Sequence, residues 1–310
     1  MKILLTGGTG FIGSHVLIKL IELGHSVTVL ARNIEKVPAI HTLPNTTVIQ
    51  AQITDFETIS SVVKGHDVCV HVALNYNDTS AYHMLMSDTA PSIFLANECA
   101  KAGVSHFIYT SSTATNDSIY ASANPPILNN TNAHVLTSSQ HAPHTYYGAT
   151  KAATENFLLS ITGTTGMRVS IIRPGYTFGN PAFEGAYTQS DQRFHTIVEA
   201  AKLNKDIEII KNDGTQFIWA PDLASIYTAV LQSNYNKKIY FGLSQNFTSW
   251  EYIALQAIQI CNSTSKLIIN DLGWSNNPIM FDVSDIQRDF HLQFNSLPHI
   301  PTHLEYLFNR

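Results

Sequence analysis

The chain has 310 residues, of which 44% are hydrophobic and only 13% charged, and its formal net charge is -5. This apolar content can fill the core of one large domain or of two closely joined domains. The mild negative charge and the lack of a basic run argue against nucleic acid or an anionic membrane surface as a partner. No apolar stretch reaches the roughly 20 residues of a membrane span, and the three cysteines have neither disulfide nor metal spacing, so we expect a cytoplasmic protein.

The first half of the chain alternates short apolar runs with helical patterns. The predicted strands are residues 2–6, 26–30, 47–50, 67–73, 105–110 and 168–173. The predicted helices between them are residues 11–23, 55–63, 81–102 and 146–161. Such alternation is typical of βαβ units, and it predicts an α/β fold with a doubly wound parallel sheet.

The pattern changes twice in the remainder of the chain. Residues 113–145 are polar and without a clear period, and a loop of this length is usually functional, so we consider it a candidate lid. Beyond residue 173 we predict helices at 191–203, 221–232 and 249–261, with strands at 238–241 and 266–269.

A glycine-rich loop joins the first predicted strand to the first predicted helix. Gly7, Gly10 and Gly13 have the G-x-x-G-x-x-G spacing of a dinucleotide-binding turn. The first glycine makes the tight turn, the second allows the backbone to approach a pyrophosphate, and the third allows the helix to pack against the strand. The free N–H groups of the helix then hold the negative charge. Because the loop lies between a strand and a helix, as this mechanism requires, we predict a dinucleotide cofactor.

The end of the second predicted strand indicates which cofactor is bound. NAD-binding folds place an acidic residue there to hold the ribose 2′-hydroxyl. Ala31 stands at this position, Arg32 follows it, and Lys36 lies one helical turn further on. Arginine suits a 2′-phosphate, since it can form two parallel hydrogen bonds with it. We therefore predict NADP in preference to NAD.

Tyr147 and Lys151 lie four residues apart on a predicted helix and therefore share one face. A tyrosine transfers protons poorly near neutral pH unless something stabilises its phenolate, and an adjacent ammonium group does so. Ser112 lies just after a predicted strand, at the edge of the sheet where ligands bind in open α/β folds. Its hydroxyl could hold a substrate oxygen while Tyr147 delivers a proton.

With the glycine loop, the serine and the YxxxK pair in this order, the sequence resembles the extended short-chain dehydrogenase/reductase family, also called the NAD-dependent epimerase/dehydratase family. The resemblance covers most of the chain. Three further segments look like family motifs: His71-Val72-Ala73, Ile172-Arg173-Pro174-Gly175, and residues 217–224 before a late helix.

The resemblance implies a Rossmann fold and assigns roles to individual residues. Residues 1–173 would form the dinucleotide-binding Rossmann domain, with 214–245 returning to it, while 174–213 and 246–310 would form a smaller substrate-binding region. Ser112, Tyr147 and Lys151 would be the catalytic triad. The residues expected to contact the cofactor are Gly7, Gly10, Phe11, Ile12, Gly13, Arg32, Lys36, Gln52, Ile53, Ala73, Tyr147, Lys151 and Pro174.

The sequence departs from the family pattern at three places. Thr113 and Ala114 follow Ser112 where 4,6-dehydratases carry an acidic pair. Residues 213–216 lack the arginine with which nucleotide-sugar enzymes grip a diphosphate. Gln52 replaces the aspartate on the adenine side, although an amide can still hydrogen-bond the adenine amine. The first two departures weaken the case for a sugar-nucleotide substrate.

We therefore expect an oxidoreductase that reduces a ketone or aldehyde of a small molecule, with Tyr147 as proton donor. One alternative is a nucleotide-sugar epimerase with retained NAD, since the same pair of residues serves both reactions. A second alternative is a non-catalytic NADP-binding sensor. The oligomeric state is left open, although family members often dimerise through two helices, which here correspond to residues 81–102 and 146–161.

Other residues with chemical potential are given weaker roles. His134, His141 and His144 lie in the long polar loop, where a fixed metal site is not expected. The tyrosines at 76, 82, 146, 176 and 187 could line a substrate cavity or fill the core, except that Tyr146 should point away from Tyr147 and serve packing.

Overall fold

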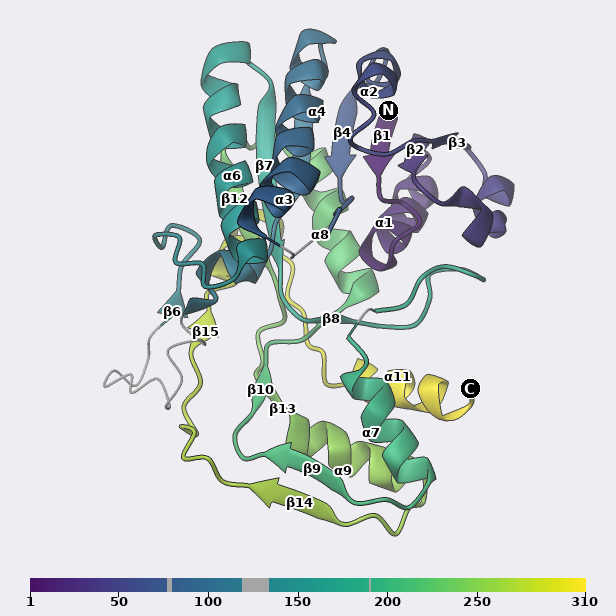
Figure 1. The fold of residues 1–310 in the computed structure, drawn as a ribbon, viewed down its shortest axis with the longest axis vertical. Coiled ribbons are helices and arrows are strands. Elements are labelled where there is room, and N and C mark those ends of the chain that lie inside the picture. The colour runs from purple at the N-terminus through teal and green to yellow at the C-terminus, as the bar shows by residue number, and fades with distance from the viewer. Residues whose placement is uncertain (77–79, 119–133, 190) are drawn as a thin grey trace.

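A computed structural model describes residues 1–76, 80–118, 134–189 and 191–310. Its central sheet has seven parallel strands in the order β12-β7-β5-β4-β1-β2-β3 (Figure 1). The strands are β1 (Lys2–Thr6), β2 (Ser26–Ala31), β3 (Thr46–Gln50), β4 (Val68–His71), β5 (His106–Thr110), β7 (Arg168–Pro174) and β12 (Lys238–Gly242). The outward order from β1 in both directions is that of a Rossmann fold, so the predicted fold class is confirmed.

Helices cover both faces of the sheet. On one face lie α1 (Phe11–Glu22) and α8 (Ala220–Gln232), and on the other lie α2 (Phe56–Val62), α4 (Ala90–Lys101) and α6 (Tyr146–Thr165). Side chains alternate between the two faces, so Ile3 and Leu5 of β1 join the core beneath α1 while Leu4 joins the opposite core. This two-sided burial explains the nearly continuous apolar runs from which the strands were predicted.

A second apolar core lies below the carboxyl ends of the strands in Figure 1. It packs α7 (Arg193–Lys202), α9 (Trp250–Ile260) and α11 (His299–Phe308) against the parallel pair β9 (Ile207–Ile210) and β14 (Leu267–Asn270). Phe194, Phe217 and Trp250 form its aromatic centre, with ring centroids 5.0–5.8 Å apart. Neither β9 nor α11 was predicted, and β14 was expected one residue earlier. These elements lie in the two segments predicted to form the substrate-binding region.

Short strand pairs lie outside the central sheet. They are β8 (Thr177–Phe178) with β11 (Ile218–Trp219), β10 (Gly214–Thr215) with β13 (Thr248–Ser249), and β6 (His134–Val135) with β15 (Met280–Phe281). The remaining short elements are η1 (Ile34–Lys36), η2 (Pro38–Thr42), η4 (Thr113–Asn116) and α10 (Ser284–Phe290). The predicted lid at 113–145 thus begins with η4 and includes β6, and residues 119–133 lie outside the described part of the chain.

The helix predicted over residues 81–102 is interrupted. It consists of α3 (Ala81–Met84), one wider π turn, η3 (Leu85–Thr89), and then α4. Pro91 explains the interruption, since it lacks an N–H group and its ring would collide with a carbonyl one α-helical turn earlier. Single π turns often occur at functional sites, and this one packs against α6.

Among the described residues, no helix has both the length and the apolar character needed to cross a membrane.

Candidate active site

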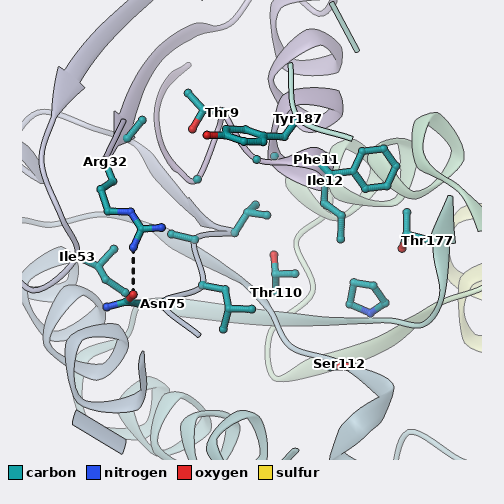
Figure 2. A pocket seen from close by; sticks show the side chains of 18 of the residues that line it. Thr9, Phe11, Ile12, Arg32, Ile53, Asn75, Thr110, Ser112, Thr177 and Tyr187 are labelled. Atoms are coloured by element: carbon teal, nitrogen blue, oxygen red, sulfur yellow. Dashed lines mark hydrogen bonds between the residues drawn. The ribbon is translucent and has the colours of Figure 1, made fainter. Parts of the chain in front are cut away.

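A cavity of about 580 Å³ follows the carboxyl edge of the sheet. Its walls come from the segments that leave β1, β2, β3, β4, β5 and β7, together with Tyr187, Thr188, Gln189 and Asp191 (Figure 2). This edge is where open α/β sheets bind ligands, at the point where the order of the strands reverses.

The glycine loop forms one wall of the cavity. Gly7, Gly10, Phe11, Ile12 and Gly13, all predicted to contact the cofactor, line it together. A Cβ on Gly13 would collide with the carbonyl oxygen of Gly7, so only glycine allows α1 to start this close to β1. Gly10 caps α1 without a side-chain hydrogen bond, and the first turn of the helix contains no acidic residue. The first N–H groups therefore remain available to an anion, and the loop fits a pyrophosphate.

Arg32 follows the end of β2 and borders the same cavity. Its exposed side chain donates a hydrogen bond from an Nη atom to Oδ1 of Asn75 at 3.2 Å (Figure 2). The guanidinium is thereby held over the end of the cavity that Gln52 and Ile53 also line. Lys36 lies on η1 as an exposed side chain outside this lining, so its predicted contact with the cofactor remains a prediction.

All three predicted catalytic residues line the cavity: Ser112 follows β5, and Tyr147 and Lys151 lie on α6. Oγ of Ser112 accepts a hydrogen bond from the backbone N–H of Ala114 at 3.1 Å, which leaves its own proton free for a ligand oxygen. Tyr147 and Lys151 project from the first two turns of α6, whose start is capped by Thr145. The Nζ atom of Lys151 lies 5.8 Å from the centroid of the Tyr147 ring.

A glycine allows the start of α6 to approach the turn that follows Ser112. Gly148 lies at the point where α6 approaches η4, and a Cβ there would collide with the carbonyl oxygen of Ala114. The helix can therefore lie directly on the turn that follows Ser112. Ala73 and Pro174, the other predicted cofactor contacts, line the cavity as well.

Lys151 is buried, and a carboxylate faces it. Its Nζ lies 3.4 Å from Oδ2 of Asp88 on η3, and the two side chains are 3% and 0% exposed. Burial alone would lower the pKa of Lys151, but Asp88 and the neighbouring phenols of Tyr109 and Tyr147 raise it above its ordinary value. Lys151 is therefore charged at neutral pH.

A series of hydrogen bonds connects the backbone of Asp88 with Thr6, the residue just before the glycine loop. His71 lies between Thr6, whose Oγ1 is 2.6 Å from its Nδ1, and Ser92, whose Oγ is 2.8 Å from its Nε2. Ser92 in turn donates to the backbone carbonyl of Asp88 at 2.6 Å. Burial, and then the charge of Lys151, lower the pKa of His71 to about 3, so the imidazole is neutral and links these groups without adding charge.

A second buried ion pair joins α6 to strand β7 of the sheet. Arg173 on β7 donates from Nε and from an Nη atom to the two carboxylate oxygens of Glu155 at 2.8 and 2.6 Å. His141 lies 2.9 Å from the same carboxylate. Burial alone would raise the pKa of Glu155, but Arg173 and His141 hold it below its ordinary value. The cluster ties residues 137–141, just ahead of Tyr147, to the sheet.

Another part of the cavity is lined by residues that follow β7, and we call it the substrate half: Tyr176, Thr177, Tyr187, Thr188, Gln189 and Asp191. Within the described ranges, Arg32 and Lys151 supply the cations of the lining. The nearby Arg193 is paired with Asp213 at 2.6 Å and stacks on Trp250. Of the tyrosines considered from the sequence, Tyr176 and Tyr187 line the cavity. Tyr76 places its ring edge against Tyr147, and Tyr82 and Tyr146 are exposed.

No group of three or more metal-ligating side chains is found in the part of the chain that the structure covers. Sequence reasoning missed Asp88, Asn75, Thr188, Gln189 and Asp191. Asp88 could have been noticed as an acidic residue three positions before a proline inside an otherwise apolar helical pattern. Thr188, Gln189 and Asp191 have no such signal, because the local sequence pattern does not show that they border the cavity.

Comparison with known proteins places these motifs in a family. A family model described as the NAD dependent epimerase/dehydratase family matches residues 3–241. A 3 beta-hydroxysteroid dehydrogenase/Delta 5-->4-isomerase of Mycobacterium tuberculosis is 28% identical over 192 residues, which are 58% of this chain and 48% of that protein. The alignment thus spans about half the length of that relative. A UDP-N-acetyl-alpha-D-glucosaminuronate decarboxylase of Bacillus cytotoxicus is 26% identical over 86% of this chain and 82% of its own length.

Solved structures show the same fold across the chain. The Bordetella bronchiseptica enzyme WbmG in complex with NAD has a TM-score of 0.79 at 18% identity, covering 100% of this chain and 94% of that one. UDP-glucose 4-epimerase of Thermotoga maritima with UDP-glucose also has a TM-score of 0.79 at 18% identity, with coverage of 100% and 99%. At this identity the likeness concerns the fold alone. The curated relatives named here are enzymes.

Proposed function

Because the chain belongs to the NAD dependent epimerase/dehydratase family, we propose that it is an NADP-dependent oxidoreductase that reduces a ketone or aldehyde of a small molecule. The observation that carries the proposal is the meeting of Ser112, Tyr147 and Lys151 in the cavity that the glycine loop borders. A dinucleotide held by that loop would reach these three side chains along one continuous surface.

The proposed division of labour follows from the positions of the groups. The bound nicotinamide would supply the hydride, as this chemistry belongs to the cofactor. Ser112 would hold the substrate oxygen with its free proton, and Tyr147 would donate a proton to that oxygen. Lys151, buried and charged, would stabilise the phenolate that Tyr147 leaves behind. The cavity walls would orient the carbonyl carbon and exclude water.

The preference for NADP rests on Arg32. Its guanidinium borders the cavity at the end of β2, where the acidic residue typical of NAD sites is replaced by Ala31. Its hydrogen bond to Asn75 fixes the side chain without neutralising its charge. A charge-assisted contact with the 2′-phosphate would add about 1.5–3 kcal/mol to binding.

A nucleotide-sugar epimerase with retained NAD is the second candidate. A UDP-glucose 4-epimerase of Neisseria meningitidis is 33% identical over 123 residues, 36% of this chain. Against this candidate stands the substrate half of the cavity: its described lining carries Asp191, and the nearby Arg193 is already paired with Asp213. A diphosphate would therefore find little positive charge there.

The test combines cofactor binding with turnover. The natively purified protein is analysed for retained nucleotide by mass spectrometry, then titrated with NADPH and NADH by fluorescence. It is also assayed with a panel of aldehydes, ketones and UDP-sugars. We expect NADPH to bind at least about tenfold more tightly than NADH, about 1.4 kcal/mol, and Arg32→Ala to remove this preference.

Tyr147→Phe separates binding from chemistry. This variant should lose carbonyl reduction and keep NADPH affinity nearly intact, because the phenol oxygen acts on the substrate. Unchanged turnover in Tyr147→Phe would contradict the mechanism. Tightly retained NAD together with interconversion of a UDP-sugar would favour the epimerase instead.

A further inference from the structure

The carboxylate of Asp88 is buried in an unusual position, opposite the lysine that serves the proposed proton donor. Its Oδ2 atom lies 3.4 Å from Nζ of Lys151 and makes no hydrogen bond within the described residues. An isolated buried carboxylate is strongly unfavourable, so the charge of Lys151 is what compensates it.

The local backbone holds Asp88 in this place. The π turn η3 directs residue 88 toward α6, and the backbone N–H of Asn75 donates to Oδ1 of Asp88 at 3.3 Å. Ser92 fixes the following turn by donating to the carbonyl oxygen of Asp88 at 2.6 Å. The carboxylate is therefore constrained from both sides, and it has no exposed surface through which to escape into water.

Among the described residues, three buried titratable groups beside this pair are neutral near pH 7. Burial raises the pKa of Tyr109 on β5 and of Tyr227 on α8 well above the ordinary value of 10.0. Burial lowers the pKa of His71 on β4 to about 3. The ring of Tyr76 lies against that of Tyr147. Within the described ranges, Lys151 and its partner Asp88 thus form the charged pair beside the ring of Tyr147.

We propose that Asp88 is a positioning residue that balances the charge of Lys151, so that Tyr147 serves as a proton donor and the reductive direction is favoured. An ammonium group alone would favour the phenolate, the form that accepts a proton. A carboxylate on the far side of that ammonium opposes this effect, because it favours the neutral phenol. The meaning of this balance for catalysis rests on the proposed function, whereas the charge balance itself does not.

The proposal is tested by titrating the phenol of Tyr147 without any substrate. Phenolate absorbs in the near ultraviolet, and subtracting the titration of Tyr147→Phe from that of the wild type isolates Tyr147 from the other tyrosines. The same subtraction is made between Asp88→Asn and the double variant Asp88→Asn/Tyr147→Phe. We expect the midpoint to fall by about one pH unit or more in the Asp88→Asn background, since one opposing charge has been removed.

Asp222→Asn is the matched control, because it removes one negative charge on α8 outside the cavity lining. Its midpoint should remain that of the wild type. A midpoint that does not move in Asp88→Asn, or that moves equally in Asp222→Asn, overturns the proposal. The outcome is independent of whether a carbonyl substrate is found, so failure of the proposed function and failure of this inference are distinguishable.

A second measurement applies if Asp88→Asn does not fold. Lys151→Met leaves the buried carboxylate without its partner, and adding Asp88→Asn removes that carboxylate. Chemical unfolding should show the double variant to be more stable than Lys151→Met alone. A double variant that is equally or less stable would overturn the pairing, and with it the proposal.

Discussion

The buried pair of Glu155 and Arg173 gives the sharpest prediction about stability. In Glu155→Gln the guanidinium of Arg173, only 1% exposed, loses the counter-charge to which it donates two hydrogen bonds. Removing one partner of a buried pair leaves an uncompensated charge, which costs about 3–5 kcal/mol. We therefore expect the free energy of unfolding to fall by about this amount, as measured by urea denaturation followed by fluorescence and circular dichroism.

The pH dependence of this loss has a defined sign. The pKa of Glu155 in the folded protein lies below its ordinary value of 4.5, so the carboxylate stabilises the fold fully above that pH. Its contribution disappears as the pH falls through the lower folded value. The difference between wild type and variant should therefore be largest near neutral pH and shrink in acid.

Glu199→Gln provides the comparison. Glu199 pairs with Lys202 one helical turn away, and its side chain is 40% exposed. Exposed pairs of this kind contribute about 0.5 kcal/mol or less. If Glu155→Gln proved no more costly than Glu199→Gln, the reasoning about a buried compensating charge would be wrong.

Three further predictions concern the cavity and the buried histidines. Gly13→Ala should weaken NADPH binding by roughly 5- to 150-fold, because the new Cβ overpacks the glycine loop at a cost of about 1–3 kcal/mol. Gly163→Ala is the control, since its new Cβ meets only Nζ of Lys237 at 4.0 Å, and fluorescence titration should show unchanged affinity. Ser112→Ala should lower kcat about 100-fold or more in the carbonyl assay, and an equal rise in KM with unchanged kcat would contradict its role toward the transition state. Burial lowers the pKa of His15 and His303 from 6.5 to about 4, and that of His71 and His106 to about 3. Because the unfolded chain then binds more protons than the folded protein, the urea concentration at the unfolding midpoint should fall as the pH drops below 6.5. A midpoint that stayed constant would refute this prediction.

Local sequence patterns predicted the Rossmann half of the molecule well. Strands β1, β2, β3, β5 and β7 lie within one residue of their predicted ends. For β1, β5 and β7, burial on both faces leaves a nearly continuous apolar run in the sequence. The second core was predicted less well. Strand β9 alternates Ile207, the charged Glu208 and Ile209 over only four residues, which is too short a pattern to separate from a loop.

The candidate site likewise has a part that local sequence predicts and a part that it does not. Gly7, Gly10 and Gly13 lie in one loop, and Tyr147 and Lys151 lie on one helix face. The relative positions of these residues therefore follow from their spacing along the chain. Lys36 was expected one helical turn after Arg32. The short 3₁₀ turn η1 lies there, with Lys36 outside the cavity lining, and its contact with a cofactor stays a prediction.

The sequence by itself therefore determined the fold class, the dinucleotide loop and the Tyr147–Lys151 pair, because each depends on residues a few positions apart. Only the tertiary structure decided which charges surround that pair. Asp88 reaches Lys151 across 62 intervening sequence positions through the packing of η3 on α6, and Glu155 reaches Arg173 through the packing of α6 on β7. Such contacts depend on how whole elements pack together, and electrostatic balance in a buried site is set by those contacts.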